Sequence, residues 1–131
     1  MNTRSRDRHR DRGEAAAQLV IITPLLVLLI FLGVQAAIYF HATNVAAAAA
    51  SQGAAAASPR TAQAGDGAAA AHVTITDLGS QSAGAPSVLE ANGYVSVTVT
   101  IVVPRILPFF PDSVSRTAIE PKERFVAESD R

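Results

Sequence analysis

Cysteine and tryptophan are absent from this chain of 131 residues, and aromatic side chains make up only 5% of it. Without cysteine, these residues form neither a disulfide framework nor a thiolate metal site, and they offer no thiol for a lipoprotein-type acyl group. Without tryptophan, an aromatic belt at a membrane surface has to rest on Tyr39 and Phe40. These absences exclude several classes of small protein but do not decide the compartment.

Residue patterns that carry catalysis are also missing. His9, His41 and His72 lie in three different settings, without a carboxylate or serine at a spacing typical of a catalytic or metal site. The glycines cluster with alanine and serine, and the sequence contains neither a phosphate-binding loop nor a dinucleotide fingerprint. The sequence therefore predicts a non-enzymatic protein with no cofactor, no metal ion and no small-molecule substrate.

Charge is balanced overall but unevenly placed. The formal net charge is zero, yet residues 1–13 carry a local charge of +3 and residues 41–131 a local charge of −2. A broad basic surface of the kind that binds nucleic acid is missing, so we expect no nucleic-acid partner. The positive N-terminal segment instead predicts a topology signal beside a membrane helix. Five arginines form this signal: Arg4, Arg6, Arg8, Arg10 and Arg12.

A long apolar run follows the arginines. Residues 19–38 read LVIITPLLVLLIFLGVQAAI and contain no charged side chain. A helix of this length spans ~30 Å at ~1.5 Å per residue, which matches the hydrocarbon core of a bilayer. We predict a transmembrane helix over residues 14–40, kinked near Val20 because Pro24 removes a backbone hydrogen bond.

The position of the arginines predicts the direction of this helix. Because basic residues flank membrane helices on the cytoplasmic side, we expect a single-pass cell-membrane protein with a cytoplasmic N-terminus and an extracytoplasmic C-terminal part. A cleaved secretory signal peptide is the alternative. The apolar run is longer than the usual ~7–15 residues, and no A-x-A cleavage site stands out at its end. The alanine run after Asn44 does offer loose matches to such a site.

Residues 41–71 predict an alanine-rich helical extension or linker. Alanine is the best helix former, so the membrane helix should continue to Ala57 and end at Ser58 and Pro59. A low-complexity tether is the alternative for this stretch. Residues 60–71 are ambiguous between a second short helix and a linker, and the Gly-Asp-Gly sequence at 65–67 favours a break.

Three strands are predicted after this linker, at residues 72–78, 94–103 and 114–125, with a loop at 79–92. The second strand, YVSVTVTIVV, is the clearest, because its valines and Ile101 fall on one face and its hydroxyl side chains on the other. Three prolines within residues 104–111 then predict a rigid connection. Its Phe109 and Phe110 form either a lid over the small core or an exposed patch.

These elements predict an α+β fold, in which a long N-terminal transmembrane helix precedes a small extracytoplasmic domain with a few antiparallel strands. A hairpin alone would be marginal, so the helix or a partner must cover the valine face. We expect five segments. They are the basic cytoplasmic segment 1–13, the transmembrane helix 14–40, the alanine-rich stretch 41–71, the β-rich domain 72–126 and the charged tail 127–131.

The junction of the basic segment and the apolar run resembles known precursors. Residues 12–24, RGEAAAQLVIITP, resemble the N-terminus of type IV pilin-like precursors. The longer stretch through AAIYFHATNVAAAAASQGAAAA, the valine–threonine strand and the closing SRTAIEPKERF resemble the actinobacterial type of TadE-like proteins of tight-adherence pilus systems. The resemblance covers residues 12–126 and is strongest through residue 57.

The resemblance implies a processing site and a role. A prepilin peptidase would cut after Gly13, on the cytoplasmic side, and leave Glu14 as the first residue. The family usually has glutamate five residues after the cut, where this chain has Gln18. In pilins that glutamate is thought to pair with the terminal amine of a neighbouring subunit. Glutamine supplies no charge, which puts polymerisation by this pairing in doubt and favours an accessory pseudopilin.

The expected function is thus a membrane-anchored TadE-like component of a tight-adherence, type IV-like pilus assembly or secretion system. Its expected partners are the lipid bilayer, other pilus-assembly membrane proteins and a prepilin peptidase. The alternative is a generic exported or membrane-tethered binding or adhesion module, whose N-terminal helix is either kept or removed by signal peptidase.

Overall fold

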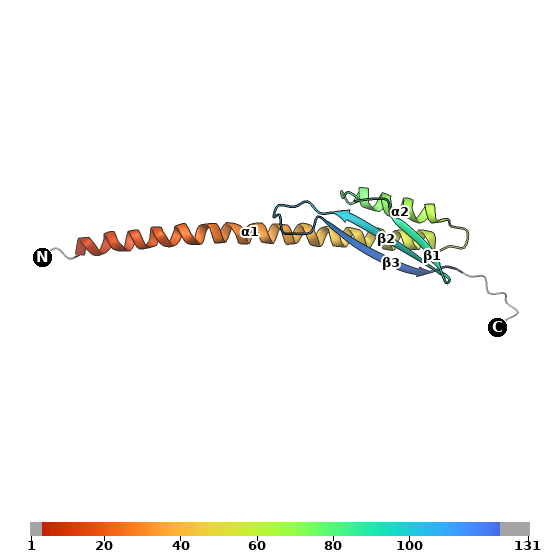
Figure 1. Cartoon of the computed structure of the whole chain (residues 1–131), viewed down its shortest axis with the longest axis horizontal. Coiled ribbons are helices and arrows are strands. Elements are labelled where there is room, and N and C mark those ends of the chain that lie inside the picture. The colour runs from red at the N-terminus through yellow and green to blue at the C-terminus, as the bar shows by residue number, and fades with distance from the viewer. Residues whose placement is uncertain (1–3, 124–131) are drawn as a thin grey trace.

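The computed structural model describes the backbone of residues 4–123 and the side chains of residues 16–123. Figure 1 shows one long helix that carries a small mixed domain at its C-terminal end. The α+β prediction is confirmed. The elements in chain order are the helices α1 (Arg4–Ala57) and α2 (Ala64–Asp77) and the strands β1 (Ser87–Ala91), β2 (Tyr94–Val102) and β3 (Ser113–Pro121).

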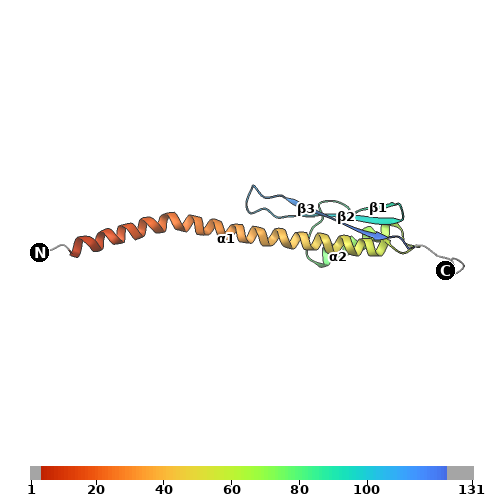
Figure 2. The ribbon, with the colours of Figure 1, turned by 90° about the horizontal axis from the view of Figure 1, so that it is seen from below.

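Helix α1 is continuous for 54 residues and includes Pro24. Figure 2 shows a bend in its red-to-orange part, the part in which Pro24 falls. Proline removes one backbone hydrogen bond there and its ring presses on the preceding turn, so the helix bends rather than breaks. The helix ends at Ala57, directly before Ser58 and Pro59, as predicted.

The strand predicted at residues 72–78 is wrong, because residues 72–77 belong to α2 and Leu78 is the C-cap of this helix. The alternation in HVTITDL was misleading, since four alanines precede it and favour a helix. Ala71 and Ile75, four residues apart, are buried on one side of this helix. At its start the Asp66 carboxylate accepts a hydrogen bond from the Gln63 N–H at 2.8 Å, so the expected break at 65–67 is instead a helix start.

The loop predicted at residues 79–92 is wrong in its second half, because Ser87–Ala91 form the strand β1. β1 pairs with β2 in an antiparallel register that places Ala91 opposite Tyr94. The two residues between them, Asn92 and Gly93, have φ values of 54° and 79°. Two positive φ values identify a type I′ hairpin turn, for which Asn-Gly is the strongest short sequence signal. The loop predicted over residues 79–92 did not take this signal into account.

The sheet has the order β1-β2-β3 with both pairs antiparallel. β3 covers Ser113–Pro121, so it begins one residue before the strand predicted at 114–125 and ends at Pro121. Residues 124–131, which include the charged tail, lie outside the described part. β2 alternates buried and partly exposed side chains as predicted. The expected boundaries between the five segments, at residues 13, 40, 71 and 126, remain predictions. The boundary at residue 71 falls within α2.

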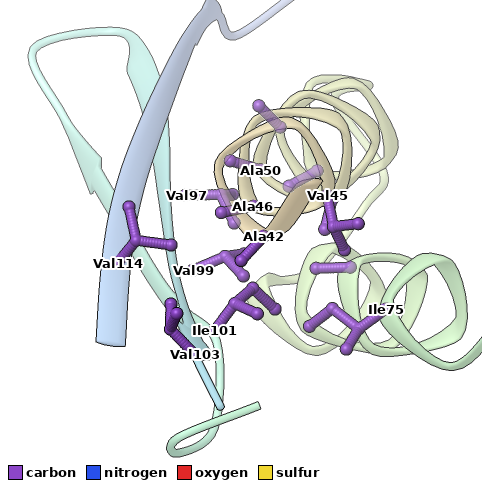
Figure 3. Packing of buried hydrophobic residues seen from close by; sticks show 14 of the residues in the cluster. Ala42, Val45, Ala46, Ala50, Ile75, Val97, Val99, Ile101, Val103 and Val114 are labelled. Atoms are coloured by element: carbon purple, nitrogen blue, oxygen red, sulfur yellow. The ribbon is translucent and has the colours of Figure 1, made fainter. Parts of the chain in front are cut away.

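The sheet forms one layer of the domain and the two helices form the other, as Figures 1 and 2 show. The core lies between these two layers. Figure 3 shows Val97, Val99 and Ile101 of β2 pointing toward α1 and Ile75. The helix therefore covers the valine face, as predicted. Most of the α1 contribution is alanine. The buried hydrophobic cluster is Ala42, Val45, Ala46, Ala49, Ala50, Ala54, Ala57, Ala71, Ile75, Val95, Val97, Val99, Ile101, Val103 and Val114.

Two glycines allow the helices to approach each other closely. A Cβ atom added at Gly53 of α1 would lie 2.8 Å from the carbonyl oxygen of Gly67 in α2 and 3.0 Å from a methyl group of Val97. A Cβ added at Gly67 would lie 2.8 Å from the Gly53 carbonyl oxygen. Because backbone atoms bound this contact, a side chain at either position requires the helices to move apart.

We predict that Gly53→Ala destabilises the domain by about 1–3 kcal/mol, because it overfills a closely packed contact. The matched control is Gly65→Ala in the first turn of α2, where an added Cβ meets nothing within 4 Å. That change should be neutral or slightly stabilising, since alanine favours a helix. Thermal unfolding of both full-length variants in detergent, followed by circular dichroism, checks this. Equal melting temperatures for the two would contradict the contact.

Candidate functional site

The N-terminal half of α1 presents an apolar surface that no part of the described chain covers. Among the described residues, one helix is long and apolar enough to cross a membrane, between Ala16 and Ala57, and none of its most apolar 18 residues is buried. This surface indicates a single-pass membrane anchor. Its exposed large side chains are Leu19, Val20, Ile21, Ile22, Leu25, Leu26, Val27, Leu28, Leu29, Ile30, Phe31 and Val34.

The other half of α1 is part of the head, which we define as α1 from Ala42 onward, α2 and the sheet. A stripe of small buried residues with spacings of three and four runs along this half, the pattern of one helix face. The stripe continues toward the membrane through half-buried Ile38 and Tyr39 and begins at Gln35, which is fully buried. The head-facing stripe therefore starts inside the predicted transmembrane run, residues 19–38.

Gln35 binds the connection between β2 and β3. We call residues 104–111, PRILPFFP, the tip loop. The Gln35 Nε2 group donates to the Pro104 carbonyl oxygen at 3.2 Å, and its Oε1 accepts from the Ile106 N–H at 2.7 Å and the Leu107 N–H at 3.4 Å. One amide side chain thus pairs with three backbone groups of the loop. It satisfies polar groups that would otherwise be costly to bury.

The tip loop reaches back along α1 toward its N-terminus, as far as the orange part of the helix in Figures 1 and 2. Its base is closed by a hydrogen bond from the Val103 N–H to the Asp112 carbonyl oxygen at 2.7 Å. Ile106 is 45% exposed and Phe109 68% exposed, and the Phe109 and Phe110 ring centroids lie 5.4 Å apart. The sequence left open whether Phe109 and Phe110 form a lid over the core or an exposed patch. Phe109 belongs to an exposed patch.

A hollow of about 450 Å³ opens beside the base of the tip loop. It lies between α1, the segment that follows α2, and the end of β2. His41 is on its wall and is exposed. The other lining residues are Ala37, Ile38, Ala42, Gly79, Ser80, Gln81, Val102 and Pro104. The apolar residues of this wall extend the exposed apolar surface of α1 to the end of the head that lies nearest the N-terminal half of the helix.

The opposite end of the head is fastened by Lys122. Its Nζ donates to the carbonyl oxygens of Ala57 and Ala62 at 2.9 and 3.0 Å and pairs with the Glu90 carboxylate at 3.0 Å. An ammonium group at the C-terminus of α1 satisfies an unpaired carbonyl and suits the helix dipole. The Ser58 hydroxyl also donates to the Pro121 carbonyl oxygen at 2.6 Å. The end of β3 is therefore fixed to the end of α1.

The residues predicted for processing and topology lie at the other end of the molecule. The backbone from Arg4 to Gln18 is helical and continuous with the rest of α1, so the arginines, Gly13 and Glu14 all fall on this helix. The side chains of residues 4–15 lie outside the described part. Gln18 is exposed. Gly13 is 22 residues from Gln35, or ~33 Å along a helix, so the processing site and the head do not meet.

Among the described side chains, residues 16–123, no group of three or more histidine, cysteine, aspartate or glutamate side chains is placed to hold a metal ion. His41 and His72 are exposed on different helices, and His9 lies outside this part. The candidate site is therefore a set of surfaces, made of the exposed apolar helix, the tip loop and the hollow beside it.

Comparison with known protein families gives a match, and it lies within α1. The family described as TadE-like protein has a model that matches residues 13–55. The chain carries a TadE-like segment. The resemblance noted in the sequence is thereby confirmed over most of α1, from Gly13 into the head. No curated protein and no solved structure matches the chain.

The TadE-like segment associates the chain with tight-adherence pili. The TadE-like family consists of structural or accessory pilus components and is not known for enzymatic activity. Other pilus-assembly components are the class of partner that this family indicates. Together with the exposed apolar helix, the match supports a membrane protein of the pilus system.

The structure also brings out residues that sequence analysis missed. Gln35 and Lys122 were not singled out as functional residues from the sequence. A lone amide near the outer end of a transmembrane run is itself a signal, because an unpaired polar group is costly there. That signal predicts a partner for Gln35, but it does not say which segment of the chain supplies one.

We predict that Gln35→Leu frees the tip loop, because it leaves the N–H groups of Ile106 and Leu107 without an acceptor, at about 1–3 kcal/mol for a buried group. Trypsin cleavage after Arg105, in the detergent-solubilised full chain, should become several-fold faster. Cleavage after Arg60, in the turn between α1 and α2, should not change and serves as an internal reference.

Gln52→Leu is the matched control for this experiment, because Gln52 lies on the same helix and is exposed. It should leave cleavage at both sites unaltered. If Gln35→Leu and Gln52→Leu gave the same rate after Arg105, the hydrogen bonds of Gln35 would not be what holds the loop.

Proposed function

We propose that this protein is a membrane-anchored accessory pseudopilin of a tight-adherence pilus assembly or secretion system. It acts by packing its helix against other membrane components and by presenting the head outside the membrane. A single observation carries this proposal. The TadE-like match covers residues 13–55, and these residues belong to one unbroken helix that is apolar and exposed in its first half and built into the head in its second.

The charge distribution supports the direction of insertion. Residues 1–13 have a local charge of +3, whereas the chain beyond residue 41 has a local charge of −2. Basic residues beside a membrane helix remain in the cytoplasm, so the head lies on the outer side. In this arrangement the lipid bilayer covers the first half of α1, and pilus-assembly partners meet the part of the chain beyond it.

Processing by a prepilin peptidase after Gly13 is the proposed maturation step. The family match begins at this glycine. The residue lies within helical backbone, and a peptide bond has to leave a helix to be cut, which glycine eases by about 1 kcal/mol relative to alanine. Removal of residues 1–13 would take away the arginines and leave the head-facing stripe intact.

The alternative cut by signal peptidase, in the alanine run after Asn44, is less well supported. It would divide α1 where Val45 and Ala46 are buried against the head. It would also separate Gln35 from the tip loop. The head would lose contacts at both positions. A module released by this cut would therefore lack part of the packing that stabilises its core.

We predict that Gly13→Leu blocks processing without affecting insertion, because leucine stabilises the helix and adds bulk at the bond to be cut. Mass spectrometry of the membrane fraction should show a mature wild-type chain that begins at Glu14 and a variant that keeps its original N-terminus. Ser115→Cys, on the exposed face of β3, reports insertion in both backgrounds.

This cysteine would be the only thiol in the chain, so an impermeant maleimide should label it equally in intact cells in both backgrounds. Normal processing of Gly13→Leu would count against the peptidase. A wild-type start beyond Asn44 would instead support an exported module, and labelling that required lysis would overturn the proposed orientation.

Gln18 is the basis for proposing an accessory component rather than a fibre subunit. It takes the place of the usual family glutamate and is exposed near the start of the apolar surface. A glutamine accepts a hydrogen bond but carries no charge with which to pair a neighbouring amine in the membrane, where such pairing is strong. Assembly through that charge is therefore not open to this chain.

We predict that Gln18→Glu leaves insertion and processing unchanged and allows the chain to join filaments. The charge it introduces could pair with the new terminal amine of a second copy. Electron microscopy of shed filaments with an antibody against the head checks this, and Gln18→Ala is the uncharged control. Filaments that contain the wild-type chain as their main subunit would contradict the accessory role.

A further inference from the structure

We propose that the tip loop enters the outer leaflet of the membrane beside α1, so that lipid acyl chains cover Ile106 and Phe109. The chain then meets the bilayer twice, through its transmembrane helix and through this loop. The proposal rests on the membrane anchor of the proposed function. It adds an interaction surface in the head and names its partner, a lipid surface.

The level at which the loop is held supports this. Gln35 lies 16 residues after Leu19, the start of the apolar run, which is ~24 Å along a helix. The hydrocarbon core is ~30 Å thick, so Gln35 lies a few ångströms below its outer edge when Leu19 is at the inner edge. The tip loop binds Gln35 directly, with the Ile106 N–H at 2.7 Å from Oε1. The loop is therefore at the depth of the outer lipid boundary.

The backbone of the loop is suited to that depth. Irregular backbone is tolerated near hydrocarbon only where its polar groups are satisfied within the protein. Three of the eight tip-loop residues are prolines, which have no N–H to satisfy. The N–H groups of Ile106 and Leu107 donate to Gln35, and the Phe110 N–H donates to the Leu107 carbonyl oxygen at 3.3 Å. Most of the loop's donors are thus absent or already bonded.

The side chains of the loop continue the apolar surface of the helix. The exposed large hydrophobic residues of α1 include Val34, one residue before Gln35, and Phe40, five residues after it. Ile106 and Phe109 are exposed on the loop that is bound at Gln35. Arg105 is exposed beside them, and its long side chain can extend to the phosphate level while its stem remains apolar. Apolar tips with a flanking cation are the composition that favours the boundary of a bilayer.

The absence of tryptophan allows a direct test with single-tryptophan variants of the full chain. Phe109→Trp places the probe on the tip loop, Phe31→Trp on the exposed apolar face of α1, and Tyr94→Trp on the exposed face of β2. Each change replaces one aromatic side chain by another. The protein is reconstituted in phosphatidylcholine vesicles, with and without phosphatidylglycerol, and quenching by lipids brominated on the acyl chain is compared with quenching by aqueous iodide.

We expect brominated lipids to quench Trp fluorescence in Phe109→Trp and in Phe31→Trp several-fold more than in Tyr94→Trp, and iodide to show the reverse order. Adding Gln35→Leu should reduce lipid quenching in Phe109→Trp and leave it unchanged in Phe31→Trp. Because apolar side chains carry the contact, phosphatidylglycerol should change these values little.

Three outcomes overturn the proposal. If Phe31→Trp is quenched by lipid and Phe109→Trp only by iodide, the loop lies in water and the anchor still stands. If Phe109→Trp is shielded from both quenchers, protein covers the loop instead of lipid. If even Phe31→Trp escapes lipid quenching, the membrane anchor fails as well, and the proposed function fails with it.

Discussion

The rest of the structure depends on one helix that has to satisfy two environments along its length. Helix α1 is continuous for 54 residues. Its first half exposes leucine, isoleucine and valine side chains, and its second half buries a narrow stripe of alanines against the sheet and α2. Small side chains let the backbones approach, and larger ones on α1 would force the layers apart. The same requirement explains why Gly53 faces Gly67 and why the bulk of the core comes from β2.

Much of this architecture could be predicted from local patterns. The uncharged run at 19–38 identifies the anchor, the alanines after Asn44 extend the helix, and Ser58-Pro59 ends it. The strict alternation in β2 identifies the buried valine face. Residues 72–78 show where such patterns fail, because a short alternating stretch also fits a helix with one buried face. The helix forms since the preceding alanines nucleate it and Ile75 finds a place in the core. The missed strand β1 had its signal in Asn92-Gly93, outside the strand itself.

The candidate site also has one part that local sequence patterns predict and one part that they do not. The processing site proposed at Gly13 rests on a local pattern of about a dozen adjacent residues and remains a prediction, whereas the family match covers residues 13–55 as a whole. The contact between Gln35 and Ile106 joins residues 71 positions apart. A spacing of that kind leaves no periodicity to detect, so the sequence predicts that a polar residue in an apolar run needs a partner but cannot name it. The prolines of the tip loop predict rigidity, and only the fold shows that this rigid segment lies against the helix.

The overlap between anchor and head has a mechanical consequence. Because the head-facing stripe begins at Gln35, within the apolar run, the last turns of the predicted transmembrane segment belong to both parts. At the other end, Lys122 and Ser58 fix the end of β3 to the end of α1. The head is thus bonded to α1 at both of its ends, and because α1 is continuous, no linker separates the apolar half of the helix from the head. Displacement of α1 along its axis would carry the tip loop and the sheet by the same distance. A component with this construction passes a force on its head directly to its membrane helix.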